Sequence, residues 1–178
     1  MDKILLGAGH HPNYPGACYF NLREYDIVKR MCLNIFTNFK EKMNLGIVAD
    51  NTNVTDYNSF MRWKVDWINK YNPDLYIEFH LNANVSGLAN GVEVLVNPKF
   101  DGVIPVAEKL VNLSSLILGN KNRGVIKRTD LYVLNTTKCN SMIYEVYFLS
   151  NKKEVDLYNF NYVDNVVGWV LYRALKSF

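Results

Sequence analysis

Short apolar segments of strand length alternate with longer amphipathic segments of helix length along the whole of this 178-residue chain. Strands that alternate with helices form a layered α/β domain in which helices cover both faces of the sheet. The apolar runs predict strands at residues 3–8, 47–49, 75–81, 91–96, 130–134 and 141–148. The amphipathic segments predict helices at residues 21–42, 58–71, 103–118, 154–158 and 163–176, with a turn at 120–124. We therefore expect an α/β fold with a twisted, mixed but mostly parallel sheet of about six strands.

A single domain is also what length and composition predict. The chain is long enough to bury a core, and its 49% hydrophobic and 21% charged residues are typical of globular proteins. Residues 1–178 contain no Ser/Gly-rich linker and no internal repeat. The net charge of +3 is too small to indicate nucleic-acid binding. No apolar run approaches the roughly 18 residues of a membrane span, so we expect no membrane insertion.

Titratable side chains occur near the ends of three of the expected strands. His10 follows the first strand, His80 lies at the end of the strand at 75–81, and Glu145 interrupts the apolar strand at 141–148. Glu24 is in the first turn of the first helix, which begins near the end of the first strand. In open α/β sheets the functional crevice lies outside the carboxyl ends of the strands. We therefore expect these four side chains to meet at one edge of the sheet.

This residue set favours a metal site, although each member has a plainer explanation. Two imidazoles and one carboxylate with an open fourth position form a ligand set of catalytic zinc, and another carboxylate nearby can act as a general base. A single histidine at a strand end is more often structural. The negative charge of Glu24 would interact favourably with the positive end of its helix dipole. Glu145 is harder to explain in this way, because a buried unpaired carboxylate is costly.

The glycines after the first strand suggest a second possibility, a dinucleotide-binding loop. Gly7-Ala8-Gly9 follows a strand as that fingerprint requires, but Pro12 stands where the third glycine would meet the pyrophosphate. The imidazoles of His10 and His11 would also crowd the approach. The sequence therefore argues against nucleotide binding.

A series of short motifs extends in order through nearly the whole chain. They are Gly9-His10, Pro15-Gly16-Ala17, Glu24, Phe79-His80-Leu81-Asn82-Ala83, Gly91-Val92-Glu93-Val94, Asn122-Arg123-Gly124-Val125, Tyr132-Val133-Leu134, Tyr144-Glu145 and Phe148-Leu149-Ser150-Asn151. Each motif is short, but in this order they are specific. The chain resembles the zinc-dependent N-acetylmuramoyl-L-alanine amidases of phage endolysins and bacterial autolysins.

The resemblance implies a peptidoglycan hydrolase that cleaves the amide between N-acetylmuramic acid and L-alanine of the stem peptide. One Zn²⁺ per chain would be held by His10, Glu24 and His80, and Glu145 would be the catalytic proton carrier. Residues 1–178 would form the catalytic domain, with no wall-binding domain in this chain. The alternatives are a zinc peptidase or carboxypeptidase acting within the stem peptide and a catalytically inactive wall-binding module. The inactive module is disfavoured because all four chemical groups are present.

Some residues beside the motifs are candidates for substrate binding. Asn82 would bind the peptide or orient the histidine, although an amide that solvates a strand end is the plainer explanation. Arg128, with Arg123 and Lys127, would attract the carboxylates of the stem peptide, although solvated surface charge is the default.

Three further residues lie close to the expected ligands. Glu78 is two residues before His80 and therefore points to the same face of its strand, where it would support the histidine. We expect Glu93 to face substrate or solvent. His11 stands where the family usually has glycine. It is either a substrate contact or an exposed neighbour of His10, and we expect the neighbour.

The N-terminal segment has too short an apolar run for a signal peptide, and the 3 cysteines lack paired spacing. We therefore expect synthesis in a bacterial cytoplasm and action on the cell wall after the membrane has been permeabilised. A role in phage lysis is what the resemblance implies, with a mother-cell or spore autolysin as the alternative. A monomer is the favoured oligomeric state.

Overall fold

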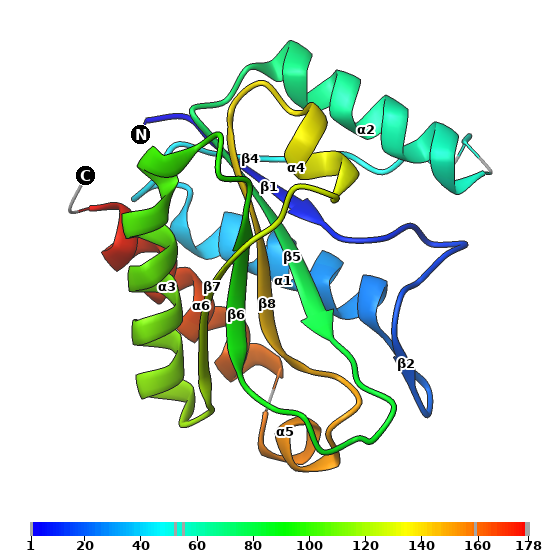
Figure 1. The fold of residues 1–178 in the computed structure, drawn as a ribbon, viewed down its shortest axis with the longest axis vertical. Coiled ribbons are helices and arrows are strands. Elements are labelled where there is room, and N and C mark those ends of the chain that lie inside the picture. The colour runs from blue at the N-terminus through cyan, green and yellow to red at the C-terminus, as the bar shows by residue number, and fades with distance from the viewer. Residues whose placement is uncertain (1, 52, 55, 159, 177–178) are drawn as a thin grey trace.

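A six-stranded sheet runs through the centre of the molecule, with strand order β4-β1-β5-β8-β6-β7 (Figure 1). The computed structural model describes residues 2–51, 53–54, 56–158 and 160–176. The strands of the sheet are β1 (Ile4–Ala8), β4 (Leu45–Ile47), β5 (Leu75–Asn82), β6 (Val92–Val96), β7 (Asn122–Lys127) and β8 (Asn140–Phe148). A separate hairpin pairs β2 (Cys18–Tyr19) with β3 (Leu22–Arg23).

The sheet is mixed but mostly parallel, which confirms the expected fold class. β4, β1, β5 and β8 are parallel neighbours, β6 is antiparallel to β8, and β7 is parallel to β6. The carboxyl ends of β1, β5 and β8 therefore share one edge of the sheet with the amino ends of β6 and β7. This edge is where the sequence places the candidate residues.

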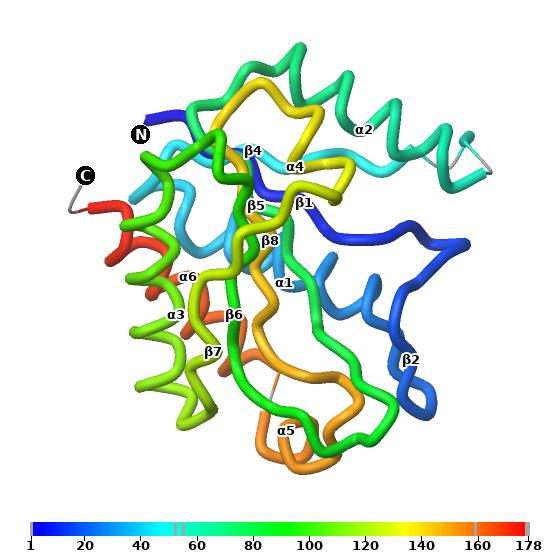
Figure 2. Tube along the Cα trace, viewed as in Figure 1, coloured from blue at the N-terminus to red at the C-terminus, as the bar shows by residue number. Residues whose placement is uncertain are grey.

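Helices cover both faces of the sheet, as expected (Figure 2 traces the same path). One face is covered by α1 (Glu24–Phe39), α3 (Ile104–Leu118) and α6 (Phe160–Leu175). The other face is covered by α2 (Tyr57–Tyr71) and α4 (Tyr132–Thr136). The short helix α5 (Lys152–Leu157) follows β8, and the 3₁₀ helix η1 (Asp101–Val103) precedes α3.

The two faces of the sheet differ in how far their apolar packing extends. The face under α1, α3 and α6 is apolar along its length, and it carries most of the core. On the face under α2 and α4, an apolar cluster around Tyr76, Leu95 and Ile143 fills only part of the surface. Because side chains of a strand alternate between faces, the next positions on this face are Glu78, Glu93 and Glu145. The candidate site is therefore an extension of the sheet face that carries α2 and α4.

Two elements near residues 120–136 differ from the sequence prediction. The expected turn at 120–124 is largely part of β7, an edge strand. Its pattern is interrupted because Arg123 is an extra residue opposite β6 and Gly124 has a left-handed φ of 87°. Such a bulge breaks the regular alternation that identifies a strand from its sequence.

The expected strand at 130–134 is wrong, because residues 132–136 form α4. The hydroxyl of Thr136 donates to the carbonyl oxygen of Tyr132 at 2.6 Å, and the hydroxyl of Thr137 donates to that of Val133 at 2.8 Å. These bonds stabilise a single helical turn that buries Val133 and Leu134 against the sheet.

The start of the second strand is also displaced. β4 covers Leu45–Ile47 rather than 47–49, and α1 ends at Phe39 rather than at residue 42. Gly46 lies inside β4, where a Cβ would come within 2.5 Å of the Tyr71 hydroxyl oxygen. Close packing against α2 therefore explains this glycine.

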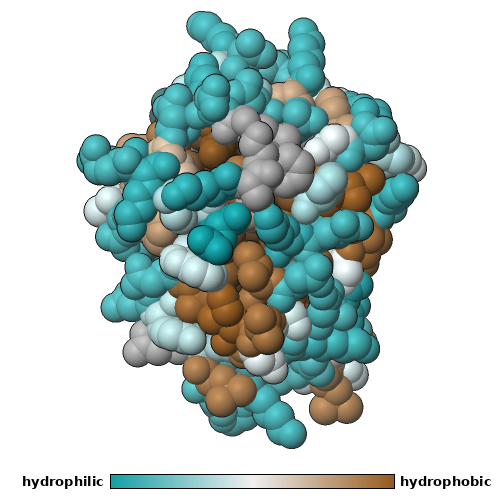
Figure 3. Space-filling model, turned by 90° about the vertical axis from the view of Figure 1, so that its left-hand side faces the viewer, coloured by the Kyte–Doolittle hydropathy of each residue, from teal (hydrophilic) through white to brown (hydrophobic). Residues whose placement is uncertain are grey.

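An apolar patch is exposed on the side of the molecule that carries α3, seen in Figure 3. Between α3 and α6 it includes a shallow groove lined by Ile117, Tyr162, Val166 and Trp169. Among the described residues, no helix has both the length and the apolar character needed to cross a membrane.

Candidate metal centre and active site

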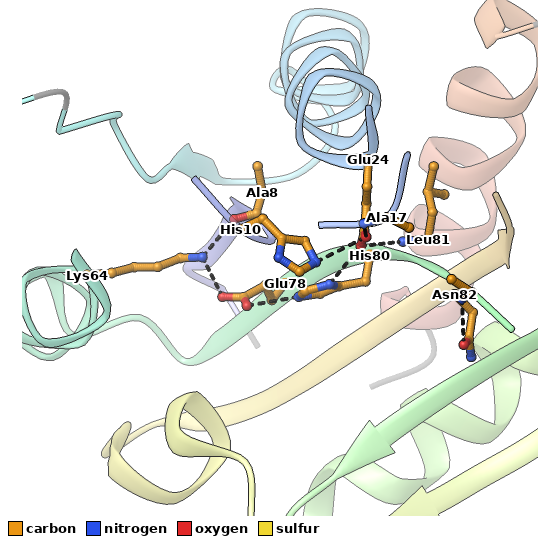
Figure 4. A network of polar contacts seen from close by, with 10 residues as sticks. Ala8, His10, Ala17, Glu24, Lys64, Glu78, His80, Leu81 and Asn82 are labelled. Carbon is orange, nitrogen blue, oxygen red and sulfur yellow. Dashed lines mark hydrogen bonds and ion pairs between the residues drawn. The ribbon is translucent and has the colours of Figure 1, made fainter. Parts of the chain in front are cut away.

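Glu24 lies at the centre of a cluster at the sheet edge and is only 3% exposed. Its Oε2 is 3.1 Å from Nε2 of His10, and its Oε1 is 2.9 Å from Nδ1 of His80 (Figure 4). The backbone N–H groups of Ala17 and Leu81 donate to the same two oxygens at 2.8 Å and 3.0 Å. Each carboxylate oxygen therefore faces one imidazole and is fixed by one backbone amide.

The cluster fits a metal ion by its donors and by the room that two glycines leave. One ligand atom from each of His10, Glu24 and His80 lies within 4.8 Å of the others. A Cβ on Gly9 would lie 2.3 Å from the His80 ring, and a Cβ on Gly16 would lie 2.4 Å from both Glu24 and His10. These three side chains could hold a metal ion.

The backbone at His10 is strained in a way that is typical of functional sites. Its φ of 66° lies in the left-handed region, which a residue with a side chain adopts only at a cost of about 1–3 kcal/mol. This conformation turns the chain sharply after β1. The rings of His10 and His80 then lie edge to face, with 4.8 Å between their centroids. The turn therefore brings the two imidazoles together.

The charges of the cluster favour a cation beside the carboxylate of Glu24. Burial alone would raise the pKa of Glu24, but hydrogen bonds with His10 and His80 outweigh it and lower the pKa to about 2. Burial would lower the pKa of His80, but hydrogen bonds with Glu24 and Glu78 raise it to about 10. A metal ion at this position would replace a proton on His80, because a ligating imidazole must be neutral.

Glu145 lies beside this cluster on β8. It is the direct cross-strand neighbour of His80 on β5 and of Glu93 on β6. Its Oε2 is buried and has no hydrogen-bond partner among the described residues. Burial raises the pKa of Glu145 to about 7, with the charge of His80 opposing the rise and nearby carboxylates adding to it. A carboxyl group that titrates near neutral pH suits general acid–base chemistry.

Glu93 is held by two donors on the other side of Glu145. The side-chain amide of Asn82 donates to Oε1 of Glu93 at 2.7 Å, and Nε of Arg123 donates to Oε2 at 2.6 Å. Arg123 is the extra residue of the β7 bulge, and bulges commonly redirect a side chain in this way. Glu93 is therefore buried and ion-paired, so of the two expected orientations the solvent-facing one is wrong.

Glu78 is held by donors from three residues. Its Oε2 accepts Nζ of Lys64 at 2.7 Å and the hydroxyl of Tyr76 at 2.5 Å, and its Oε1 lies 3.1 Å from Nε2 of His80. Lys64 extends from α2 and is 1% exposed. Figure 4 shows this chain of contacts leading from α2 to the histidine cluster.

The structure brings together the four residues that the sequence singled out, His10, Glu24, His80 and Glu145. Their chemical roles stay predictions.

The two candidates for substrate binding lie apart from this group. Asn82 lies at the same edge but donates to Glu93. Arg128 follows the opposite end of β7, where it forms an exposed ion pair with Asp130.

His11 differs from expectation because it is buried, with 1% exposure. Its ring packs against that of Phe60, with 4.5 Å between the ring centroids, and its Nδ1 accepts the backbone N–H of Asn13 at 3.1 Å. The His10, Glu24 and His80 group does not include it. His11 is therefore a packing neighbour of the cluster.

Lys64 is the site residue that the sequence analysis missed. It belongs to the stripe of α2 that faces the sheet, together with Phe60, Met61, Val65 and Ile68. A lysine among apolar residues at helical spacing is the signal that could have revealed a buried counter-charge.

A groove of about 330 Å³ opens beside His80, between α2 and α4. Its walls are mostly apolar and aromatic, with one arginine, and they include Tyr57, Met61, Arg62 and Tyr132. Glu78 and His80 lie at its inner end, so the groove leads directly to the histidine cluster.

The comparison with protein families decides the relationship of the chain. The model of the N-acetylmuramoyl-L-alanine amidase family matches residues 4–177, nearly the entire sequence. The chain belongs to the N-acetylmuramoyl-L-alanine amidase family. The sequence resemblance drawn from the ordered motifs is therefore confirmed.

Relatives of this family member are longer proteins. A 38.4 kDa protein of Clostridium perfringens is 26% identical over 97% of this chain and 50% of its own length. The N-acetylmuramoyl-L-alanine amidase LytC of Bacillus subtilis (strain 168) is 27% identical over 86% of this chain and 30% of its own length. The chain thus spans half or less of these two curated relatives.

The amidase fold extends over the whole chain. The catalytic domain of the CD27L endolysin, which targets Clostridia difficile, superposes with a TM-score of 0.79. The match covers 97% of this chain and 98% of that domain at 24% identity. The sheet and the helices on both of its faces are therefore those of an amidase catalytic domain.

Proposed function

We propose that this protein hydrolyses the amide bond between N-acetylmuramic acid and the L-alanine of the peptidoglycan stem peptide. The observation that carries the proposal is the meeting of His10, Glu24 and His80 beside Glu145, in a chain of the N-acetylmuramoyl-L-alanine amidase family. LytC of Bacillus subtilis carries the name of this activity.

The proposed cofactor is Zn²⁺, one per chain. His10 and His80 would hold it through neutral imidazoles and Glu24 through its carboxylate, a donor set that leaves a position for water or substrate. When bound, zinc polarises the scissile carbonyl and makes water more acidic. Gly9 and Gly16 support the proposal because they leave the ligands the space in which to converge.

Glu145 is the proposed general base and then general acid. Its unpartnered Oε2 would accept a proton from the attacking water. As the C–N bond of the amide breaks, the same oxygen would donate that proton to the leaving L-alanine nitrogen. Burial raises the pKa of Glu145 to about 7 in the metal-free protein, which suits a group that takes up and then releases a proton.

The groove between α2 and α4 is the proposed place for part of the stem peptide. It ends at His80, and Tyr57, Met61 and Tyr132 would pack against apolar portions of the substrate. Asn82 at the end of β5 and Arg128 ahead of α4 are proposed substrate contacts. Both would have to exchange a present partner, Glu93 or Asp130, for a substrate group.

Analysis of peptidoglycan digests by mass spectrometry tests the reaction. We expect glycan strands with free muramic acid lactyl carboxyls, and released peptides whose new amino terminus is L-alanine. New amino termini within the stem peptide would instead identify a peptidase. Wall binding without any new amino group would identify an inactive binding module.

Metal removal tests the cofactor. Exhaustive chelation should abolish wall lysis and added zinc should restore it. His10→Ala should lose bound zinc, whereas His11→Ala should retain most of it, because the buried His11 ring is outside the ligand group. Full activity in protein shown by elemental analysis to be metal-free would refute the metal mechanism.

The biological role that we propose is lysis of a bacterial host, with synthesis in the cytoplasm and access to the wall after permeabilisation of the membrane. The shared fold with the CD27L endolysin domain supports this role. Expression inside a susceptible bacterium should leave cells intact until a membrane-permeabilising agent is added. Lysis without permeabilisation would contradict it.

A further inference from the structure

A chain of buried polar contacts connects helix α2 with His80. Nζ of Lys64 donates to the Ala8 carbonyl oxygen at the end of β1 and to Oε2 of Glu78, each at 2.7 Å. Oε1 of Glu78 lies 3.1 Å from Nε2 of His80. Lys64 and Glu78 are 1% and 3% exposed, so these contacts are shielded from water.

We propose that Glu78 and Lys64 are positioning residues that fix which nitrogen of His80 faces the metal site. When the imidazole is neutral, as a metal ligand must be, Glu78 accepts the N–H of Nε2, so that Nδ1 carries the lone pair on the side of Glu24 and His10. This inference rests on the proposed function, in which His80 is a metal ligand.

The placement of the two carboxylates around His80 supports this assignment. Glu24 lies 2.9 Å from Nδ1 and Glu78 lies 3.1 Å from Nε2, so the two acids lie on opposite sides of one ring. The group of potential ligands contains Glu24 but not Glu78. A neutral imidazole has one N–H and one lone pair, and the partner of the N–H selects which nitrogen binds a metal. Glu78 therefore acts on the metal site through the ring.

Lys64 serves this arrangement in two ways. Its ammonium compensates the charge of Glu78, which would otherwise be a buried carboxylate without a cation beside it. Its bond to the Ala8 carbonyl oxygen also ties α2 to the end of β1, two residues before His10. One side chain thus links the end of β1, which leads to His10, with β5, which carries His80.

Zinc affinity, measured by competition with a chromogenic chelator, is the first test. The double variant Lys64→Met/Glu78→Met removes the acceptor without leaving a buried unpaired charge, and such replacements of ion pairs are often neutral in stability. Loss of a residue that orients a metal ligand typically weakens binding by roughly 10- to 100-fold, and we expect that loss here. Glu78→Gln, which keeps the shape but removes the charge, should weaken binding in the same direction and by less.

A matched control comes from another buried carboxylate. Asp164 accepts Nε of Arg30 at 3.3 Å and the amide of Asn34 at 2.6 Å, in contacts between α1 and α6. Asp164→Asn should lower the thermal stability without changing zinc affinity. If it weakens zinc binding as much as Glu78→Gln does, the effect of Glu78 is general destabilisation and the inference is wrong.

The protonation of the ring gives a readout that stability does not affect. In zinc-loaded protein, ¹⁵N-resolved imidazole spectra should show a slowly exchanging proton on Nε2 of His80 and none on Nδ1. In the Lys64→Met/Glu78→Met variant this Nε2 proton should exchange rapidly. A proton on Nδ1 in the wild-type protein, or unchanged exchange and zinc affinity in the double variant, would overturn the assignment.

The variant His80→Ala separates this inference from the function on which it rests. If His80→Ala retains zinc, the proposed ligand set is wrong and this inference fails with it. If His80→Ala loses zinc while Lys64→Met/Glu78→Met binds it like the wild type, the ligand set stands and only the positioning role is wrong.

Discussion

Glu78 and Glu145 lie on the same face of neighbouring strands, but their surroundings give them opposite properties. Glu78 accepts hydrogen bonds from Lys64 and Tyr76 and also contacts His80. Burial alone would raise the pKa of Glu78, but the ammonium of Lys64 and the contact with His80 hold it well below its usual range. Glu145 has an unpartnered Oε2 among the described residues, and burial raises its pKa to about 7.

The difference shows that partners, and not burial alone, decide what a carboxylate at this sheet edge can do. A carboxylate surrounded by donors stays ionised and is suited to hold another group in place. A carboxylate with a free oxygen and a raised pKa can take up and release a proton near neutral pH. The first description applies to Glu78 and the second to Glu145.

The largest expected effect is on turnover. Glu145→Gln removes the proposed proton carrier while preserving its shape, so the rate of wall lysis should fall by roughly 100- to 10,000-fold. Zinc stoichiometry should stay near that of the wild type, because Glu145 is outside the ligand group. Both quantities are measured on the same preparation, with Glu24→Gln as the variant that should lose zinc. Near-native turnover in Glu145→Gln would mean that another carboxylate is the base.

A smaller effect is expected on the pH dependence of stability in metal-free protein. The folded pKa of Glu145 lies above its ordinary value of 4.5, so its favourable contribution is present below pH 4.5 and is lost as the pH rises through 7. Relative to wild type, Glu145→Gln should therefore gain about 1–3 kcal/mol of stability between about pH 5 and about pH 8. Urea unfolding at both pH values measures this change.

Glu78→Gln is the matched comparison in the same unfolding experiment. The folded pKa of Glu78 is lowered, so the stability contributed by its ionised form is present above pH 4.5 and is lost only at lower pH. The loss of unfolding free energy caused by Glu78→Gln should therefore be nearly the same at about pH 5 and about pH 8. If the effect of Glu78→Gln changed between these pH values and that of Glu145→Gln did not, the assigned roles would have to be exchanged.

The smallest expected effect concerns the neighbour of Glu145. Arg123 neutralises Glu93, whose charge raises the pKa of Glu145. Arg123→Gln should therefore raise that pKa by a few tenths of a unit, because a partly exposed ion pair contributes only about 0–1 kcal/mol. The carboxyl carbon resonance of Glu145 in metal-free protein reports the change. Lys127→Gln, an exposed charge on the same strand, should leave the resonance midpoint unchanged.

The sequence was sufficient to place His80 and Glu145 because each belongs to a strong apolar strand. A titratable residue stands out in such a strand, and the parallel arrangement fixes the edge at which the strand ends. The same strand-end reasoning does not apply to Lys64, which lies on a helix. Its place in the apolar stripe of α2 is its one sequence signal, and a lysine on a helix is ordinarily solvated.

Local irregularity explains the elements that the sequence did not predict. The strand β7 contains an extra residue at Arg123 and a left-handed Gly124, so its side chains do not alternate regularly. The helix α4 is a single turn that is held by threonine hydroxyls and by burial of Val133 and Leu134, and it is too short to show helical periodicity. The pairing of Arg123 with Glu93 depends on that bulge, so the sequence pattern did not predict it either.

Gly9 and Gly16 have a consequence for how this chain tolerates mutation. A methyl group at Gly9 would overlap the ring of His80, and one at Gly16 would overlap Glu24 and His10. A descendant could therefore keep every ligand and the catalytic carboxylate and still lose the centre through one glycine-to-alanine change. The centre of this chain therefore depends on an empty volume as well as on its reactive atoms. Alanine at either position, with every ligand intact, is therefore expected to displace the ligand side chains and weaken metal binding.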